Sequence, residues 1–293
     1  MSRSVLLWRE DGSTQPFELT LMTLEVRGNG VAVACFASGE TFHALSPQMR
    51  VEMFLVLEHC KRSPAVKVVV WTATGDKAFC SGVSLKGSRD VTVDGAVLEE
   101  YARRGMAPNM VNDSAFVRET KAFWDFPKPI IGAVNGMSVG GGANIALAGY
   151  FDMVICSTNA RFQYPFVDIG FTPELGSSLY LPLVIGPLRA KQVFYSGDWF
   201  SAQDALAWGA CNEVVAPDQL LPRALAVADK LATKATPQLM LSKKLLNHHM
   251  RSFLDDQLRL ENETIQASVN DHGGKNLFLS KIKAQAKAKK ASL

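Results

Sequence analysis

The sequence lacks the cysteine patterns that build metal centres and disulfide frameworks. Its cysteines are odd in number, and no two of them have CxxC spacing. Scattered, unpaired cysteines are typical of proteins that work in a reducing compartment. We therefore expect no metal site and no disulfide framework from the five cysteines, which are Cys35, Cys60, Cys80, Cys156 and Cys211.

An excess of charge of one sign and a long apolar run are also missing. The 31 Lys and Arg residues nearly balance 28 Asp and Glu residues, and the net charge is only +3. This balance does not favour a nucleic-acid partner. No apolar run reaches the roughly 20 residues of a membrane span, and residues 1–10 have no signal-peptide apolar region. We therefore expect no membrane span and no secretory leader.

What is present is the composition of a folded protein of the α/β class. Hydrophobic residues make up 47% of 293 residues, enough for a sizeable core. Strand patterns alternate with helical ones, which favours an α/β fold. Residues 21–36 predict a hairpin around an Asn-Gly turn, and residues 46–62 predict a helix that is capped by Ser46. Apolar runs predict buried strands at 68–71, 129–134 and 153–156, and a helix is expected at 140–150.

The pattern changes after about residue 216. Strand signals disappear, and helical spacing dominates residues 222–234, 237–250 and 252–269. We predict an α/β core over residues 1–216 and a helical region over residues 217–293. Between the predicted elements of the core, residues 87–115 show no period and are expected to form a loop.

Two glycine-containing turns are the first chemical signals. Residues 78–82 (AFCSG) follow one buried strand, and Gly140-Gly141-Gly142 follows another at the start of a predicted helix. Such turns leave backbone N–H groups free to face a ligand. A dinucleotide fingerprint does not fit, because Ile145 stands where its third glycine would be needed. Two turns together suggest N–H donors that converge on one oxygen, as in an oxyanion hole.

At this point the chain resembles a known family. AFCSG at 78–82, AVNGMSVGGG at 133–142 and FQYPFVDIGFTPELGSS at 162–178 are similar to segments of the crotonase (enoyl-CoA hydratase/isomerase) superfamily. The resemblance covers residues 22–285. It implies a spiral of β-β-α repeats with a C-terminal helical subdomain, an acyl-CoA thioester as substrate, and no separate cofactor. It also implies that the N–H groups of Ser81 and Gly141 stabilise a thioester enolate.

The resemblance also suggests which reaction the chain catalyses. Hydratases of the family have two glutamates, the first at a position that matches Asn144, or Ala146 in a shifted register, and the second at a position that matches Phe166; none of these residues is an acid. Glu174, within a Pro-Glu-Leu-Gly-Ser-Ser segment, instead resembles the single base of peroxisomal Δ3,Δ2-enoyl-CoA isomerases. One base suffices to move a proton from C2 to C4. Without the resemblance, Glu174 would be a carboxylate stabilised at a helix N-terminus, and Asp168 is a rival acid.

The remaining candidate residues concern substrate binding. In the family's Asn-Ala-Leu segment, His43 replaces the asparagine, and Ser84 replaces the aspartate expected after Gly82. Lys281 and Lys283 match basic residues that can meet the phosphates of CoA, and Phe278 matches an aromatic residue that can touch its adenine, although a solvated basic tail would explain the two lysines equally well. The substrate-binding residues that the resemblance implies are Ala44, Phe79, Ser84, Leu85, Gly140, Phe166, Phe278 and Lys281.

Two other functions compete with an isomerase. One is hydration or another acyl-CoA reaction, and the other is a non-catalytic acyl-CoA- or protein-binding module, against which Glu174 argues. The helical C-terminal region and the family resemblance predict a homotrimer or hexamer. Ala291-Ser292-Leu293 is partly like a peroxisomal address, so a peroxisomal location is expected, with cytoplasmic and mitochondrial locations as alternatives.

Overall fold

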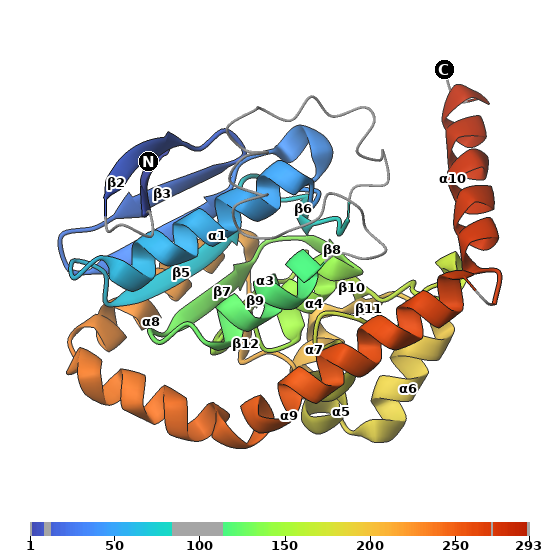
Figure 1. Cartoon of the computed structure of the whole chain (residues 1–293). Helices are drawn as coiled ribbons and strands as arrows, with labels where there is room; N and C mark the ends of the chain where they lie inside the picture. Colours follow the sequence, from blue (N-terminus) through green and yellow to red (C-terminus); the bar gives the residue numbers. More distant parts are fainter. Residues whose placement is uncertain (1, 9–12, 84–113, 271, 292–293) are drawn as a thin grey trace.

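Figure 1 shows the computed structural model of the chain, which describes residues 2–8, 13–83, 114–270 and 272–291. The predicted loop at 87–115 lies almost wholly outside these residues, as do Ser292 and Leu293 of the proposed address. The strands of the described chain are β1 Ser4–Trp8, β2 Thr14–Glu18, β3 Met22–Val26, β4 Val31–Phe36, β5 Val68–Ala73, β6 Ala78–Cys80, β7 Ile130–Val134, β8 Met137–Val139, β9 Met153–Ser157, β10 Arg161–Gln163, β11 Phe200–Ser201 and β12 Glu213–Val215.

Helices alternate with these strands and then replace them. The α-helices are α1 Pro47–Arg62, α3 Ser114–Trp124, α4 Gly141–Leu147, α5 Ser177–Ile185, α6 Pro187–Ser196, α7 Ala202–Ala207, α8 Leu220–Ala232, α9 Thr236–Asn270 and α10 Gly274–Ala291. Short 3-10 turns span η1 Gly39–Thr41, η2 Val167–Ile169 and η3 Pro217–Gln219. Beyond β12 the described chain is helical, as predicted, while a domain boundary at residue 216 stays a prediction.

Two sheets form the body of the α/β fold. The larger has the order β12-β9-β7-β5-β4-β3 and is parallel except for the β3–β4 hairpin. The smaller has the order β11-β10-β8-β6. Along the chain, β5 and β6, β7 and β8, and β9 and β10 each contribute one strand to each sheet, and α3, α4 and α5 follow them. This repeat is the predicted β-β-α spiral.

Both faces of the larger sheet are buried, and the side chains of β5 show how. Val68 and Val70 pack against α8, whereas Val69 and Trp71 point to the opposite face and join the main core. Successive side chains of a strand point to opposite faces, and a parallel sheet covered on both sides therefore reads as a continuous apolar run. This is why the strand could be predicted from sequence.

Local signals account for the start of α1 and for the two predicted strands beside it. Ser46 Oγ accepts the N–H of Met49 at 3.2 Å, and Pro47 occupies the first turn of the helix. The 21–36 hairpin is confirmed by the antiparallel pairing of β3 with β4. Two details were not predicted. A hairpin of β1 and β2 precedes the core, and the separate helices expected at 237–250 and 252–269 are one helix, α9.

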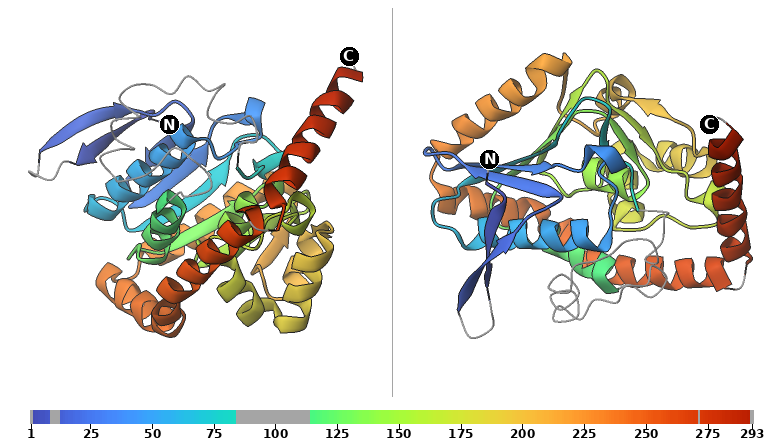
Figure 2. Two further views of the ribbon diagram at one scale, coloured as in Figure 1. Left: turned by 45° about the vertical axis from the view of Figure 1, so that its right-hand side comes forward. Right: turned by 90° about the horizontal axis from the view of Figure 1, so that it is seen from above.

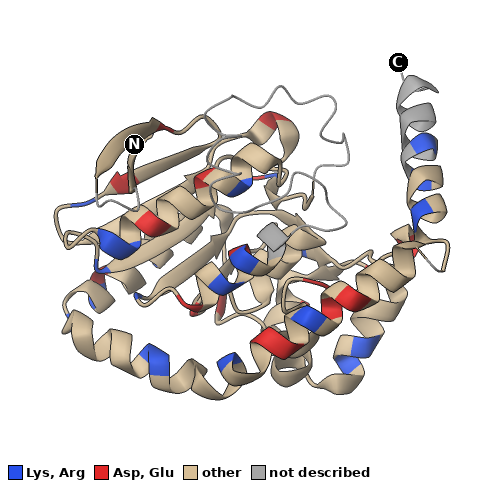
Figure 3. Ribbon diagram, viewed as in Figure 1, with Lys and Arg blue, Asp and Glu red and all other residues tan. Residues whose placement is uncertain are grey.

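The helical C-terminal region wraps the α/β body rather than forming a separate layer. Figure 2 shows α9 running across the body and α10 rising from its end. Acidic and basic residues lie interspersed along the middle of α9 (Figure 3). Within the described residues, no helix combines the length and apolar character that crossing a membrane requires.

Close packing of α4 against β6 predicts the effect of one substitution. A Cβ atom at Gly142 would lie 2.1 Å from the carbonyl oxygen of Cys80, so the backbone would have to move. We expect Gly142→Ala to destabilise the protein by at least about 1–3 kcal/mol, the usual cost of overpacking. Gly28→Ala is the control, because nothing lies within 4 Å of its added methyl group. Equal unfolding midpoints in urea for the two variants would contradict this packing.

Candidate active site

A cavity of about 450 Å³ lies where the ends of β6, β8 and β10 meet α9 and α10. The turn before α5 closes one side of it, and Ile265 of α9 contributes to its wall. Most of the residues that sequence reasoning selected are brought together here. The predicted residues in the wall are Ser81, Gly140, Gly141, Phe166, Glu174, Phe278 and Lys281, with Asp168 beside them.

Other predicted substrate-binding residues do not line this cavity. Phe79 is fully buried in the main core, where its ring packs edge-on against Phe36 at 5.5 Å. It supports the fold beneath the cavity, and the prediction of substrate contact by its side chain was wrong. Ala44 is half-buried and lies outside the described wall of the cavity. Ser84 and Leu85 lie outside the described residues.

The Ser81 N–H group is not available for an oxyanion hole. It donates a hydrogen bond to the carbonyl oxygen of Phe42 at 3.0 Å. An N–H group that is already bonded within the protein cannot also receive a thioester oxygen in good geometry. The prediction for Ser81 was therefore wrong, because its partner comes from a loop nearly 40 residues earlier that local sequence does not reveal.

The turn that carries Ser81 also carries the N–H group of Val83. Among the described residues, this N–H group has no backbone hydrogen-bond partner, and neither has that of Gly141 at the start of α4. The two residues are neighbours, since a Cβ atom at Gly141 would lie 3.8 Å from a methyl group of Val83. Gly82 makes this approach possible: its φ is +81°, and a Cβ atom there would meet the carbonyl of Val139 at 2.4 Å.

Glu174 lies in a tight turn between η2 and α5. Leu175 has a φ of 61° and Gly176 a φ of 78°, both in the left-handed region. A left-handed leucine is strained by of order 1–3 kcal/mol and persists only when its surroundings hold it. The Leu175 side chain is buried at 2% exposure, so packing provides part of that restraint.

Hydrogen bonds hold the same turn from two sides. On the inner side, the carbonyl oxygen of Glu174 accepts from Asn144 Nδ2 at 3.0 Å and from Ser177 Oγ at 2.7 Å. On the outer side, Glu261 of α9 accepts from the N–H groups of Gly176 at 2.9 Å and Ser178 at 3.1 Å. Asn144, which stands at the position of a family acid, therefore supports the backbone of Glu174.

The surroundings of Glu174 keep its carboxyl group protonated at neutral pH. Burial raises its pKa to about 8, and the negative charge of Glu261 contributes to the rise. The positive charge of Arg50 opposes this rise in pKa, and the negative charge of Glu119 adds a smaller contribution to it. Arg50 is itself engaged in a buried ion pair with Glu119 at 2.9 Å, which leaves the cluster richer in carboxyl groups than in cations.

The other acid on the cavity has a different setting. Asp168 is exposed, lies on η2 and is not among the buried carboxyl groups. Phe166, at the second position where hydratases have an acid, is 3% exposed and packs among Tyr164 and Phe194. The cavity therefore presents one enclosed carboxyl group, that of Glu174, and one that faces solvent.

His43 has a structural position. It is 1% exposed, and its ring nitrogens lie 3.1 Å from the N–H of Ser38 and 3.1 Å from the carbonyl oxygen of Thr74. Burial lowers its pKa, so that the neutral ring is favoured. The ring ties two loops together outside the cavity wall, which agrees with the expectation that this histidine is not a chemical group.

The mouth of the cavity is formed in part by α10. Phe278 packs edge-on against Phe171 with ring centroids 5.3 Å apart, and both rings line the cavity. Lys281 lies one helical turn further and is exposed. An aromatic surface beside an exposed ammonium group is suited to an adenine ring and a phosphate. Within the described residues, no group of three His, Cys, Asp or Glu side chains is placed to hold a metal ion.

The fold and this cavity define an acyl-CoA enzyme of the crotonase type. The family profile for enoyl-CoA hydratase/isomerase matches residues 26–289. The chain therefore belongs to the enoyl-CoA hydratase/isomerase family, whose members bind acyl-CoA.

Curated relatives include both hydratases and an isomerase. The chain is 32% identical to the short-chain-enoyl-CoA hydratase of Clostridium acetobutylicum, over 84% of this chain and 88% of that protein. It is 30% identical to the 1,2-epoxyphenylacetyl-CoA isomerase of Escherichia coli, over 87% of this chain and 94% of that protein. These relatives support the family and leave the individual reaction open.

Solved structures show the same fold. The enoyl-CoA hydratase/isomerase from Pseudoalteromonas atlantica superposes with a TM-score of 0.76 at 25% identity, covering 90% of this chain and 98% of that one. Pseudomonas aeruginosa OdaA gives a TM-score of 0.74 at 27% identity, covering 89% and 98%. Nearly the whole chain thus corresponds to a crotonase fold.

Sequence reasoning did not find Glu261, Val83 or the role of Asn144. A signal for Glu261 does exist in the sequence: it follows Leu254 and Leu258 at helical spacing, and all three are buried. A charged residue in the apolar stripe of a helix needs a partner. No comparable signal exists for Val83, since its free N–H group depends on the chain path around Gly82.

The position of Lys281 predicts a selective loss of affinity for CoA. Lys281→Ala should weaken CoA binding by about two- to fivefold, the range expected for an exposed charge interaction, and high salt should reduce the difference. The control is Lys283→Ala, which removes another exposed lysine of α10 from outside the cavity wall. Calorimetric titration with CoA that shows equal weakening in both variants would indicate a nonspecific basic tail.

Proposed function

We propose that the protein is a Δ3,Δ2-enoyl-CoA isomerase of fatty-acid oxidation, which converts 3-enoyl-CoA into 2-trans-enoyl-CoA. The observation that carries this proposal is the single enclosed carboxyl group of the cavity, that of Glu174. Both positions at which a hydratase of the family has glutamates hold other residues, Asn144 and Phe166. A double-bond shift needs one proton carrier, whereas hydration also needs activation of a water molecule.

In the proposed mechanism, ionised Glu174 removes a proton from C2 of the 3-enoyl thioester. The electrons move into a dienolate whose oxygen accepts hydrogen bonds from the N–H groups of Val83 and Gly141. The protonated carboxyl group then returns the proton to C4, which leaves the double bond between C2 and C3. A raised pKa suits this cycle, because Glu174 must both take and give up a proton near neutral pH.

Hydration is a second candidate, and a specific observation favours it. Asp168 lies on the same cavity wall as Glu174 and faces solvent, where a carboxylate could activate water. Curated relatives at about 30% identity are hydratases, among them the crotonyl-CoA hydratase of Syntrophomonas wolfei at 29%. The two reactions make different demands on Asp168, and substitutions can separate them.

Glu174→Gln is the direct test of the proposed base. The amide keeps the size of the carboxyl group but cannot accept the C2 proton, so kcat with 3-enoyl-CoA should fall by at least about 10²–10⁴-fold. CoA affinity should change little. Asp168→Asn is the matched control and should retain most of the isomerase activity. If Asp168→Asn abolished turnover while Glu174→Gln retained it, Glu174 would not be the base.

The pKa of about 8 at Glu174 predicts the pH dependence of the reaction. Only the ionised carboxyl group can remove the C2 proton, and the folded enzyme holds it protonated below pH 8. Therefore kcat/KM for 3-enoyl-CoA should rise about tenfold per pH unit below that value and level off above it. A profile that is flat between pH 6 and 9, or that falls on raising the pH, would show that the ionised carboxylate is not the active form.

We also propose that the chain assembles as a homotrimer or a dimer of trimers through its C-terminal helices. The support is the family and a set of large apolar side chains that α9 leaves exposed, with Leu241 at 59%, Leu245 at 77% and Leu246 at 79%. Apolar exposure of this extent marks interaction surfaces. Light scattering at micromolar concentration should give three or six times the 31.9 kDa of one chain, and a monomer would contradict the proposal.

A further inference from the structure

A buried carboxylate of α9 reaches the turn that carries Glu174. This residue, Glu261, is 5% exposed and lies 87 residues after Glu174 in the sequence. Its Oε2 atom accepts the N–H of Gly176 at 2.9 Å, and its Oε1 atom accepts both the N–H of Ser178, at 3.1 Å, and the Ser178 hydroxyl group. Burying a carboxylate in an apolar helix stripe is costly, so its retention here calls for a role.

Neutral donors hold this carboxylate. None of the ion pairs in the described part of the chain includes Glu261; the N–H groups at the start of α5 carry the partial positive charge of a helix N-terminus instead. The Ser178 hydroxyl also receives a hydrogen bond from Gln257 Nε2 at 2.7 Å. Both carboxylate oxygens of Glu261 thus accept hydrogen bonds from residues that come shortly after Glu174 and Leu175.

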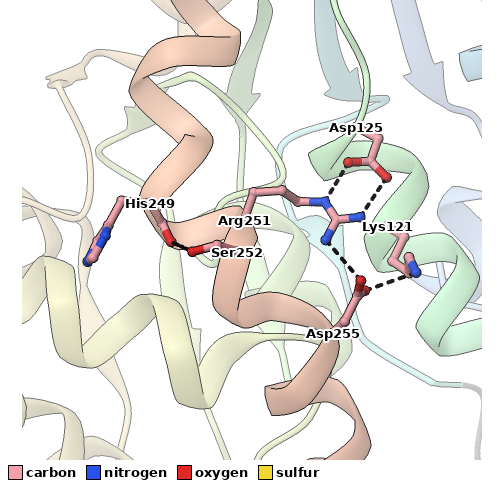
Figure 4. Close-up of polar contacts among 6 residues, drawn as sticks. All are labelled: Lys121, Asp125, His249, Arg251, Ser252 and Asp255. Atoms are coloured by element: carbon pink, nitrogen blue, oxygen red, sulfur yellow. Dashed lines mark hydrogen bonds and ion pairs between the residues drawn. The ribbon is translucent and has the colours of Figure 1, made fainter.

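The helix that carries Glu261 is itself anchored to α3 and to the residue that follows α3. Arg251 of α9 makes two hydrogen bonds to the carboxylate of Asp125, at 2.6 and 3.1 Å, and Asp255 pairs with Lys121 of α3 at 2.9 Å (Figure 4). Within the anchored segment, a methyl group of Leu254 lies 3.3 Å from the position that a Cβ atom would take at Gly176. The position of α9 is therefore transmitted to the 174–178 turn by packing and by hydrogen bonds.

We propose that Glu261 is a positioning residue for Glu174: its carboxylate holds residues 176–178 so that left-handed Leu175 persists and Glu174 stays in the wall of the cavity. The proposal rests on the proposed role of Glu174 as the base. Asn144 restrains the carbonyl group of Glu174 on the inner side, and Glu261 restrains the next peptide groups on the outer side. The C-terminal helical region thus becomes part of the catalytic apparatus.

Glu261 also acts on Glu174 through its charge. Its own pKa is raised to about 6, mainly by burial, so it is ionised near pH 8. An ionised neighbour disfavours a second negative charge, and Glu261 is, after burial, the largest cause that raises the pKa of Glu174. Removing the charge while keeping an acceptor oxygen should therefore make Glu174 ionise at lower pH.

The test compares Glu261→Gln and Glu261→Ala with Glu263→Gln, which removes an exposed carboxylate of the same helix. With 3-enoyl-CoA, Glu261→Ala should lower kcat by about 10²-fold, the effect of a misplacement of about 1 Å, while KM stays within about twofold. Glu261→Gln should retain more activity, and its pH midpoint should move below that of the parent enzyme. Glu263→Gln should change neither quantity.

An infrared titration separates failure of this proposal from failure of the isomerase assignment. The band of the Glu174 carboxylic acid, identified by its absence in Glu174→Gln, reports ionisation without any turnover. A midpoint that moves down in Glu261→Gln supports the proposal even if the substrate is not a 3-enoyl-CoA. Either of two results overturns the positioning role of Glu261 while leaving the role of Glu174 intact. One is an unchanged midpoint in Glu261→Gln, and the other is a loss of activity that a smaller fraction of folded protein explains completely.

Discussion

The left-handed turn at Leu175 and Gly176 is the constraint on which the site depends. Leucine does not adopt this conformation without restraint, and the restraint comes from two distant parts of the chain. Asn144 of α4 bonds to the carbonyl group before Leu175, and Glu261 of α9 bonds to the N–H groups after it. Because α4 belongs to the β-β-α spiral and α9 to the helical region, the turn joins the two parts of the fold at the proposed base.

The same turn sets the charge of the site. Three carboxyl groups, of Glu119, Glu174 and Glu261, lie near one guanidinium group, that of Arg50. Arg50 pairs with Glu119, and Glu261 is stabilised by backbone N–H groups, so the proton that remains in the cluster resides on Glu174. Deep burial alone would give an inert acid. Placed in the cavity wall with a pKa of about 8, the same carboxyl group is suited to the proposed role of proton carrier.

Much of the fold followed from local sequence, and some of the site did not. Ser46 and Pro47 fix the start of α1 through contacts within one turn, and the alternation of Val68 to Trp71 fixes a strand buried on both faces. Glu174 was found because its surrounding segment resembles that of a family. By contrast, whether Ser81 or Val83 has a free N–H group depends on where Phe42 places its carbonyl oxygen. Such long-range contacts carry no local pattern.

The measurement that tests this account most directly is a comparison of two reactions in one preparation of the protein. Conversion of a 3-enoyl-CoA to the 2-trans isomer would be followed beside the hydration of the matching 2-trans-enoyl-CoA. A site with one enclosed carboxyl group, at Glu174, predicts a kcat/KM for isomerisation that exceeds that for hydration by at least about 10²-fold, the lower range for loss of one acid–base group. Hydration as efficient as isomerisation would contradict it, and would assign a second catalytic acid to this cavity.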